Sequence, residues 1–409
     1  MDQSSKKTFL FIQGIYDTID LFIAACSEAF CQLGCACRVI DVRDGEPAMR
    51  MLRKEVSGID GVVTFNNIGY NLTDSNGKNI WEENNIPYIN ILMDHPFHYA
   101  AHLKNAPKTS VILCTDQNHV GFMRRFYPHL KQVDFIPHAG MEADVGQCAE
   151  AGFCHLCLNG EAYHPNMKER PIDVLYAGGL SKYAAEGLIP DLGEIQEFDA
   201  FALSREVLSE LIRHPEKTTE RAIEEYFLRI GKKYDEEALN SWITELRFID
   251  SYAASFYREQ AVRILVENGV KVAVFGGGWE RCEWAEHPNL IYGGKVLAPQ
   301  VLELMNHSKI VLNTMTWYKR GIHDRVINGM LAKAVVVTDS SEYLNESFQG
   351  QEEMLVSFSL KGMEELPDLV NGLLNRPERM SEIAEHGYRF AKSRHTWLQR
   401  AEYILENYF

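Results

Sequence analysis

The amino-acid sequence predicts an α/β protein in which two domains, each built on a parallel β-sheet, face each other across a cleft. Short apolar runs rich in β-branched residues alternate with amphipathic stretches of helical periodicity, the pattern of parallel strands joined by crossover helices. The chain has 409 residues, which is enough for two domains with a core each. The expected strands are residues 8–12, 37–42, 61–65, 88–92, 110–114 and 132–136 in the first half, and 173–177, 270–275, 289–292, 310–313, 334–338 and 355–358 in the second.

These strands divide the chain into two Rossmann-like domains, residues 1–166 and residues 167–385. Pro165 and Pro171 lie near the start of the second series of strands. Residues 183–268 lie between the first two strands of the second domain. They have helical periodicity and abundant Glu, Lys and Arg, which predicts a helical insertion in that domain.

The composition indicates a soluble globular protein, because hydrophobic residues make up 46% of the chain and charged residues 24%. The net charge of −16 argues against a nucleic-acid partner, whose phosphates would be repelled. Residues 8–12 form an apolar run too short for a signal peptide or a membrane span. We therefore expect no transmembrane segment and a cytoplasmic location.

The nine cysteines are an odd number, which favours reduced thiols over a disulfide framework. Cys154 and Cys157 form a CxxC pair with no second pair elsewhere in the chain. Such a pair could contribute to a zinc site, but ordinary thiols are the simpler interpretation. No bound metal is expected.

The loop after the strand at residues 310–313 carries the strongest signal for ligand binding. Ligands of open parallel sheets bind beyond the carboxyl ends of the strands, and a helix is expected to begin here near His323 or Asp324. Backbone N–H groups at a helix start and a planar guanidinium both suit a pyrophosphate. A surface loop with solvated basic residues is the alternative. The candidate residues are Asn313, Lys319, Arg320, Gly321, His323 and Arg325.

Two other strands of the second half end in glycines. Gly178 and Gly179 follow one, and Gly276, Gly277 and Gly278 follow the next. Glycines allow a ligand to approach the backbone closely, but they also form ordinary tight turns. The adjacent Trp279 could stack on a nucleotide base or pack on the sheet.

Polar residues also follow three strands of the first half. Asp94 and His98 are placed to accept a proton from a hydroxyl group, although Asp94 could instead cap a helix. Gly14 and Asp17 follow the first strand and could face the cleft. His138 follows the last strand and could face the cleft or be a structural histidine.

Five stretches resemble the sequence motifs of one protein family, in the same order along the chain: residues 85–96, 272–279, 292–313, 321–344 and 385–405. Together they resemble the CgeB/YkvP-like glycosyltransferases, a branch of the group 1 glycosyltransferases with the GT-B fold. The resemblance covers most of the second domain and the first domain more thinly. It implies a final helix, residues 386–409, that crosses back to the first domain. Trp397, Arg400 and Tyr403 share one face of that helix and are expected to make the contact.

The resemblance also implies the chemistry: transfer of a sugar from a nucleotide-sugar, with a UDP-sugar favoured, to a protein or glycan acceptor, without a metal or cofactor. Arg325 takes the family's arginine position and would contact the donor phosphates. His323 stands where Asn is usual and Ala334 where Gly is usual. Asn328 replaces a Glu that accepts hydrogen bonds from the ribose.

The predicted site then has three parts. Asp94 and His98 are the catalytic candidates, and Gly14, Asp17 and His138 line the acceptor cleft. The predicted donor-binding residues are Gly178, Gly179, Gly277, Gly278, Trp279, Asn313, Lys319, Arg320, Gly321, His323, Arg325 and Asn328. Two alternatives stay open: an inactive GT-B scaffold or sugar-binding protein, and a nucleotide-sugar 2-epimerase.

Overall fold

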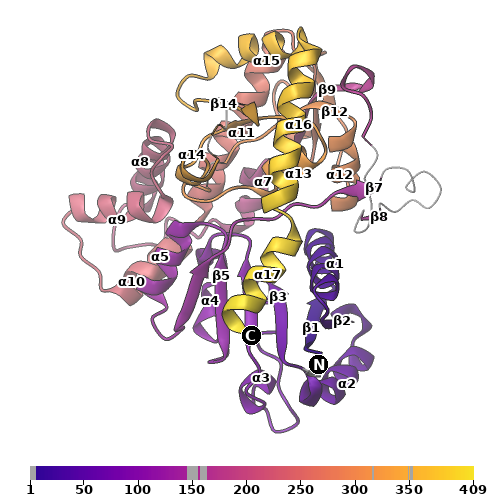
Figure 1. The fold of residues 1–409 in the computed structure, drawn as a ribbon. Helices are drawn as coiled ribbons and strands as arrows, with labels where there is room; N and C mark the ends of the chain where they lie inside the picture. Colours follow the sequence, from indigo (N-terminus) through magenta and orange to yellow (C-terminus); the bar gives the residue numbers. More distant parts are fainter. Residues whose placement is uncertain (1–5, 145–154, 157–163, 316, 349, 351–352) are drawn as a thin grey trace.

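The computed structural model describes residues 6–144, 155–156, 164–315, 317–348, 350 and 353–409 (Figure 1). Two six-stranded parallel sheets form the centres of two domains. The predicted strands are all present, with ends that differ by at most two residues. The predicted cysteine pair Cys154 and Cys157 lies outside the described residues.

The first sheet has the strand order β2-β1-β3-β4-β5-β6. Its central strands β3, β4 and β5 are buried along their whole length, as expected where helices cover both faces. The chain changes direction across the sheet between β1 and β3, which is where a crevice forms at the carboxyl ends. The strands are β1 (Thr8–Gln13), β2 (Ala36–Asp41), β3 (Gly61–Phe65), β4 (Tyr88–Leu92), β5 (Ser110–Cys114) and β6 (Gln132–Phe135).

The described part of the first domain has these α-helices beside the sheet: α1 (Asp17–Gln32), α2 (Glu46–Glu55), α3 (Ile80–Glu83), α4 (Ala100–Lys104) and α5 (Gln117–Phe126). The helix α1 buries one broad apolar face, as its sequence predicts. A short antiparallel pair, β7 (Ala143–Asp144) and β8 (His155–Leu156), follows the domain.

The second sheet has the order β11-β10-β9-β12-β13-β14, with its change of direction between β9 and β12. The strands are β9 (Ile172–Ala177), β10 (Val272–Phe275), β11 (Leu290–Tyr292), β12 (Ser308–Leu312), β13 (Val335–Asp339) and β14 (Val356–Phe358). The helices that pack around them are α12 (Ala298–Asn306), α13 (Asp324–Leu331), α14 (Glu342–Ser347), α15 (Leu366–Leu374) and α16 (Pro377–Arg394).

The predicted insertion consists of helices between β9 and β10, and it contacts both domains. One hydrophobic cluster joins Phe97 and Phe122 of the first domain to Ile223, Phe227 and Ile243 of the insertion. Figure 1 shows α9 and α10 beside α5 of the first domain. The helices are α7 (Ser181–Ala185), α8 (Ala200–Arg213), α9 (Thr219–Arg229), α10 (Glu236–Glu245) and α11 (Phe248–Glu267).

Ion pairs border the contact between α5 and the insertion. The Arg125 guanidinium donates to Glu224 at 2.8 Å and to Glu236 at 2.6 Å. These groups are partly exposed, so each pair stabilises the contact by at most about 1 kcal/mol. The burial of apolar side chains therefore dominates the attachment of the insertion to the first domain.

The final helix α17 (Trp397–Tyr408) crosses back to the first domain, as predicted, but it is shorter than the predicted helix 386–409 because residues 386–394 belong to α16 (Figure 1). Trp397 packs edge-on against Phe65 with ring centroids 5.4 Å apart. The Arg400 guanidinium donates to the carbonyl oxygen of Pro137 at 2.6 Å. Tyr403 is partly buried against the same core. The predicted contact of this helix face is confirmed.

Within the described ranges, no helix has both the length and the apolar composition that crossing a bilayer requires. The cysteines that the structure describes are all free thiols. The described residues likewise contain no group of three or more His, Cys, Asp or Glu side chains that could hold a metal ion.

The contact between the first domain and the insertion buries two histidines beside a glutamate. His95 and His119 are T-shaped neighbours with centroids 4.5 Å apart, and His95 Nε2 lies 3.5 Å from Glu220 Oε2. Burial lowers the pKa of His95 to about 3 and the pKa of His119 to about 3. Both rings are therefore neutral at physiological pH.

We expect the free energy of unfolding to fall as the pH is lowered from 7 to 5. The unfolded pKa of histidine is about 6.5, so the unfolded chain takes up protons first and is favoured in this window. His95 and His119 should each account for about 1–2 kcal/mol at pH 5. Urea unfolding at the two pH values measures the loss. His119→Gln should reduce the pH dependence and the exposed-site control His386→Gln should not. An unchanged pH dependence in His119→Gln would contradict the assignment.

Candidate functional site

Arg325 lies at the change of direction of the second sheet, as the position of its loop predicts. The helix α13 begins after His323, whose Nδ1 accepts a hydrogen bond from the Arg325 backbone N–H at 3.1 Å. The Arg325 side chain is buried and donates from Nη1 to Asn313 Oδ1 at 2.6 Å. Its guanidinium also lies over the ring of Tyr176, 5.2 Å from the centroid. These contacts fix the cation between β9 and β12.

A second buried guanidinium, from Arg258 of α11, lies near the first. Arg258 Nη1 donates to the carbonyl oxygen of Gly179 at 2.6 Å, and its guanidinium lies 4.5 Å from the centroid of the Trp317 ring. Among the described residues its Nε has no hydrogen-bond acceptor. Burial and the nearby Arg325 both lower the pKa of Arg258. Two such cations with a spare donor form a site that an anion would stabilise.

The predicted glycines form the floor of this site. A Cβ atom on Gly178 would lie 2.8 Å from Arg325 Nη2, and one on Gly179 would lie 2.7 Å from the carbonyl oxygen of Gly277. The loops after β9 and β10 therefore pack backbone against backbone, which larger residues would prevent. A Cβ on Gly277 would lie 2.6 Å from Cε of Lys295, so a third cation adjoins the glycines.

Gly278 and Trp279 serve the fold of the second domain. Gly278 has a φ of 98° and donates its N–H to Glu280 Oε2 at 2.9 Å. Trp279 is fully buried, donates from Nε1 to the carbonyl oxygen of Gly178 at 2.9 Å, and meets Tyr176 edge-on. Its interpretation as a residue that stacks on a base is wrong, because the ring is enclosed by the core.

Lys319, Arg320 and Gly321 do not join Arg325 as predicted. Lys319 Nζ donates to the carbonyl oxygen of Pro215, and Arg320 Nε pairs with Glu342 at 2.7 Å. The predicted cationic cluster is therefore divided. Arg325 faces one cavity and Lys319 lines another.

The same loop joins the two domains. The Arg320 N–H donates to Asp116 Oδ2 at 2.7 Å, and Gly321 forms a β-bridge with Asp116. Asp116 also accepts the N–H of Asn118, so it caps α5 as well. A Cβ atom on Gly321 would collide with the carbonyl oxygen of Thr115. The glycine is needed for this close approach between domains.

Asn328 contacts protein groups where a ribose contact was expected. Its Oδ1 accepts the N–H of Met141 at 3.0 Å, and its Nδ2 donates to Asp324 Oδ2 at 3.2 Å. Both ends of the amide are therefore engaged within the chain. Ala334 stands at the family's glycine position, and the residue with a left-handed conformation at the end of α13 is its neighbour Lys333, with a φ of 50°.

Asp94 lies at the carboxyl edge of the first sheet among hydroxyl and amide groups. Its Oδ2 accepts hydrogen bonds from Tyr99 Oη at 2.7 Å and from Asn66 Nδ2 at 3.3 Å. Asn66 Nδ2 also donates to Tyr16 Oη at 2.6 Å. The alternative role of Asp94 as a helix cap is wrong, because His95 is the capping residue. The carboxylate is held in place by groups that leave it half-buried.

The other first-domain candidates take different positions. Asp17 Oδ2 accepts the N–H of Ala298, the first residue of α12, at 2.6 Å, and so joins the domains. Gly14 forms a turn with a φ of 106°. His138 is buried and stacks parallel to His323 with centroids 6.3 Å apart, so it is structural. His98 is exposed, and no described hydrogen bond joins it to Asp94.

A cavity of about 270 Å³ lies between the domains. The first turn of α1 borders it on one side, and α12 and the start of α13 border it on the other. Its polar lining residues include Asp17, His323, Asp324, Arg325 and Asn328. The structure thus brings Asp17, His323, Arg325 and Asn328 to one cleft, in agreement with the predicted geometry.

Comparisons with known proteins concern the second half of the sequence and the fold. Residues 258–406 match the model of a family described as glycosyl transferase-like. No curated protein sequence matches the chain.

Solved structures match over nearly the whole chain at low identity. An alpha-glucosyltransferase in complex with UDP and a 13-mer DNA matches with a TM-score of 0.52 and 11% identity, over 98% of this chain and 99% of that one. Sucrose-phosphate synthase from Thermosynechococcus elongatus matches with a TM-score of 0.51 and 11% identity, over 98% of both chains. Anabaena HepE in complex with UDP-glucose matches with a TM-score of 0.48 and 10% identity, over 98% of both chains. The chain has the GT-B fold, as predicted.

The sequence prediction missed several residues of the site. Lys295 follows the predicted strand at residues 289–292, so the rule on strand ends could have found it. Arg258 lies inside the long helix α11 and gives no local signal. Asn66 and Tyr99 hold Asp94, but nothing in their local sequence marks that role.

We expect Arg258→Ala and Arg325→Ala each to weaken the binding of UDP by about 1.5–3 kcal/mol, the contribution of a hydrogen bond to a charged group. Isothermal titration calorimetry measures the change. Arg263→Ala is a matched control, because Arg263 lies on the same helix but is exposed and paired with Glu267. Unchanged affinity in folded Arg258→Ala and Arg325→Ala proteins would show that the diphosphate binds elsewhere.

Proposed function

We propose that this protein is a glycosyltransferase that moves a sugar from a nucleotide-sugar to an acceptor hydroxyl. The observation that carries the proposal is the pair of buried guanidinium groups, Arg258 and Arg325, beside Gly178 and Gly179. As the bond to the anomeric carbon breaks, negative charge develops on the departing diphosphate. Fixed cations at that point stabilise the transition state more than the ground state.

The donor in this proposal is a UDP-sugar. Solved structures of the matched alpha-glucosyltransferase are described as complexes with UDP or with UDP-glucose, which is a statement about that protein. The first-domain side of the cleft would then present the acceptor, a protein or glycan hydroxyl. The finer assignment to the CgeB-like branch, and the location in the cytoplasm, are part of the same proposal.

Incubation with UDP-, GDP- and dTDP-sugars tests the activity directly. We expect release of UDP from at least one UDP-sugar and loss of that release in Arg325→Ala. Binding of nucleotide without any turnover would instead favour an inactive scaffold. This second candidate function is favoured by one observation: the Asn328 amide is hydrogen-bonded to Met141 and Asp324 and not left available for a ribose.

Metal independence is part of the proposal, because arginines and the start of α13 can take the role that a divalent cation has elsewhere. We expect turnover to persist in EDTA at the rate measured without it. The matched experiment adds Mn²⁺ or Mg²⁺ after chelation. Loss of turnover in EDTA with recovery on adding either ion would contradict a metal-free mechanism.

Asp94 is the proposed general base. Its carboxylate would take the proton of the acceptor hydroxyl while the acceptor oxygen attacks the anomeric carbon. The diphosphate leaves with the electron pair of the broken bond. This role for Asp94 applies if the anomeric configuration inverts, because a transfer that retains the configuration needs no protein base. The hydrogen bonds from Tyr99 and Asn66 keep the carboxylate aimed during this step.

We expect Asp94→Asn to lower kcat by about 10²-fold or more, the usual contribution of a general base, with little change in UDP affinity. Steady-state kinetics and calorimetry measure the two quantities. Asp44→Asn is a suitable control, since that residue is exposed in the same domain. His98→Gln tests the other candidate. Near-normal kcat in Asp94→Asn would remove Asp94 from the chemistry.

A further inference from the structure

A second cavity, of about 560 Å³, lies at the carboxyl ends of β13 and β14, where the insertion covers the second domain. It is distinct from the cleft that contains Arg325. Its lining includes Glu216, Tyr318, Asp339, Ser357, Phe358 and Lys361. The volume suits a small ligand rather than a single water.

The charges around this cavity disfavour a phosphate. Carboxylates outnumber amines in its lining, with Glu216, Asp339, Glu342 and Glu365 against Lys319 and Lys361. An anionic ligand would be repelled, whereas carboxylates and serine hydroxyls can both hydrogen-bond to sugar hydroxyls. Phe358 and Tyr318 add apolar surface of the kind that packs against the C–H face of a sugar ring.

Asp339 is the central polar group of this wall. Its side chain is buried, and Oδ1 accepts the N–H of Met315 at 2.6 Å. Burial raises the pKa of Asp339 to about 6. The group therefore carries a charge at neutral pH at an energetic cost, which a ligand hydroxyl would reduce by donating a hydrogen bond.

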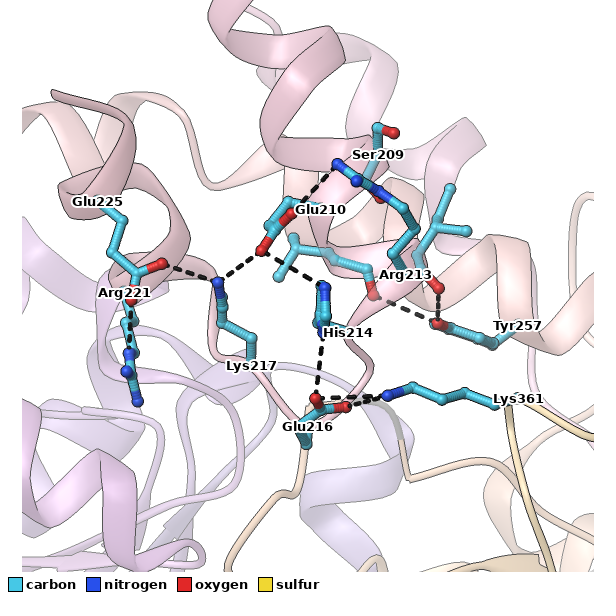
Figure 2. A network of polar contacts seen from close by, with 12 residues as sticks. Ser209, Glu210, Arg213, His214, Glu216, Lys217, Arg221, Glu225, Tyr257 and Lys361 are labelled. Carbon is cyan, nitrogen blue, oxygen red and sulfur yellow. Dashed lines mark hydrogen bonds and ion pairs between the residues drawn. The ribbon is translucent and has the colours of Figure 1, made fainter. Parts of the chain in front are cut away.

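The insertion side of the cavity is held in place by a polar network (Figure 2). Glu216 pairs with Lys361 of the second domain at 3.2 Å and with His214 at 3.3 Å. Lys217 joins Glu210 and Glu225, and so links the same loop to α8 and α9. Glu216 and Lys361 are both exposed, so their pair shows where the insertion meets the second domain at the edge of the cavity and adds little stability.

Tyr318 separates this cavity from the proposed base. It lines the cavity, and its hydroxyl donates to the carbonyl oxygen of Met93, the residue before Asp94, at 2.5 Å. The cavity therefore lies on the other side of this buried side chain from the loop that carries Asp94.

We propose that this cavity is a glycan subsite that holds a neutral sugar unit of an oligosaccharide acceptor, at a distance from the hydroxyl that reacts. The proposal rests on the proposed function for its biological meaning, but binding in the cavity is measurable without turnover. It identifies the acceptor as a glycan of several units.

Saturation-transfer NMR with maltotriose, cellotriose and chitotriose tests the subsite in the full chain. We expect at least one trisaccharide to bind. Ser357→Trp places a large side chain at an exposed position of β14 in the lining and should weaken that binding at least 10-fold. Glu364→Trp, exposed and outside the lining, is the matched control and should bind normally. The Asp339→Asn side chain can still accept the Met315 N–H, and this variant should weaken trisaccharide binding at least 5-fold.

Calorimetry with UDP on the same variants separates the outcomes. Unchanged UDP affinity with weakened trisaccharide binding supports the subsite, even if no sugar transfer is ever found. The subsite is overturned if no trisaccharide binds the wild-type protein, or if Ser357→Trp binds it normally. It is also overturned if Asp339→Asn weakens UDP instead, because the cavity would then belong to the donor. A melting temperature for each variant shows that it is folded.

Discussion

The arrangement of the cleft depends on one buried cation, Arg400. Its guanidinium donates to the carbonyl oxygens of Pro137 at 2.6 Å, His138 at 2.9 Å and Arg394 at 3.0 Å. Burial lowers the pKa of Arg400 to about 10, so it remains charged at neutral pH. The bonds to Pro137 and His138 join α17 to the segment that leaves the first sheet, and the bond to Arg394 joins α17 to the end of α16. Without it, buried carbonyl groups would lack donors, which costs more than the bonds themselves contribute.

The segment held by Arg400 also fixes how the first domain contacts α13 of the second. The Gly140 N–H donates to the carbonyl oxygen of His395 at 2.8 Å, and the next residue, Met141, donates to Asn328 of α13. The same helix α13 begins with His323 and Arg325, so the helix start is positioned by contacts with the chain crossing between domains. This explains why Asn328 has protein partners.

The sequence predicted the fold well because strand patterns are local. The runs 61–65, 88–92 and 110–114 are apolar throughout and became fully buried strands. Arg325 and Asp94 were found because both follow strands. Lys319 and Trp279 were misplaced for another reason: the partners that fix them, Pro215 and Gly178, are distant in sequence. Arg258 could not be predicted, because the sequence of a helix interior does not indicate which groups a side chain will contact in the folded protein.

The insertion has a consequence for how the cleft changes shape. Its helices share a hydrophobic cluster with Phe97 and Phe122 of the first domain, although the chain enters them from the second. A rotation about a flexible linker would pull that cluster apart and expose it to water. A rotation that separated α10 from α5 would therefore cost free energy, whereas small sliding displacements would keep the cluster buried. The opening of the cleft to ligands would then depend on the packing of these apolar side chains more than on the composition of the connecting segments.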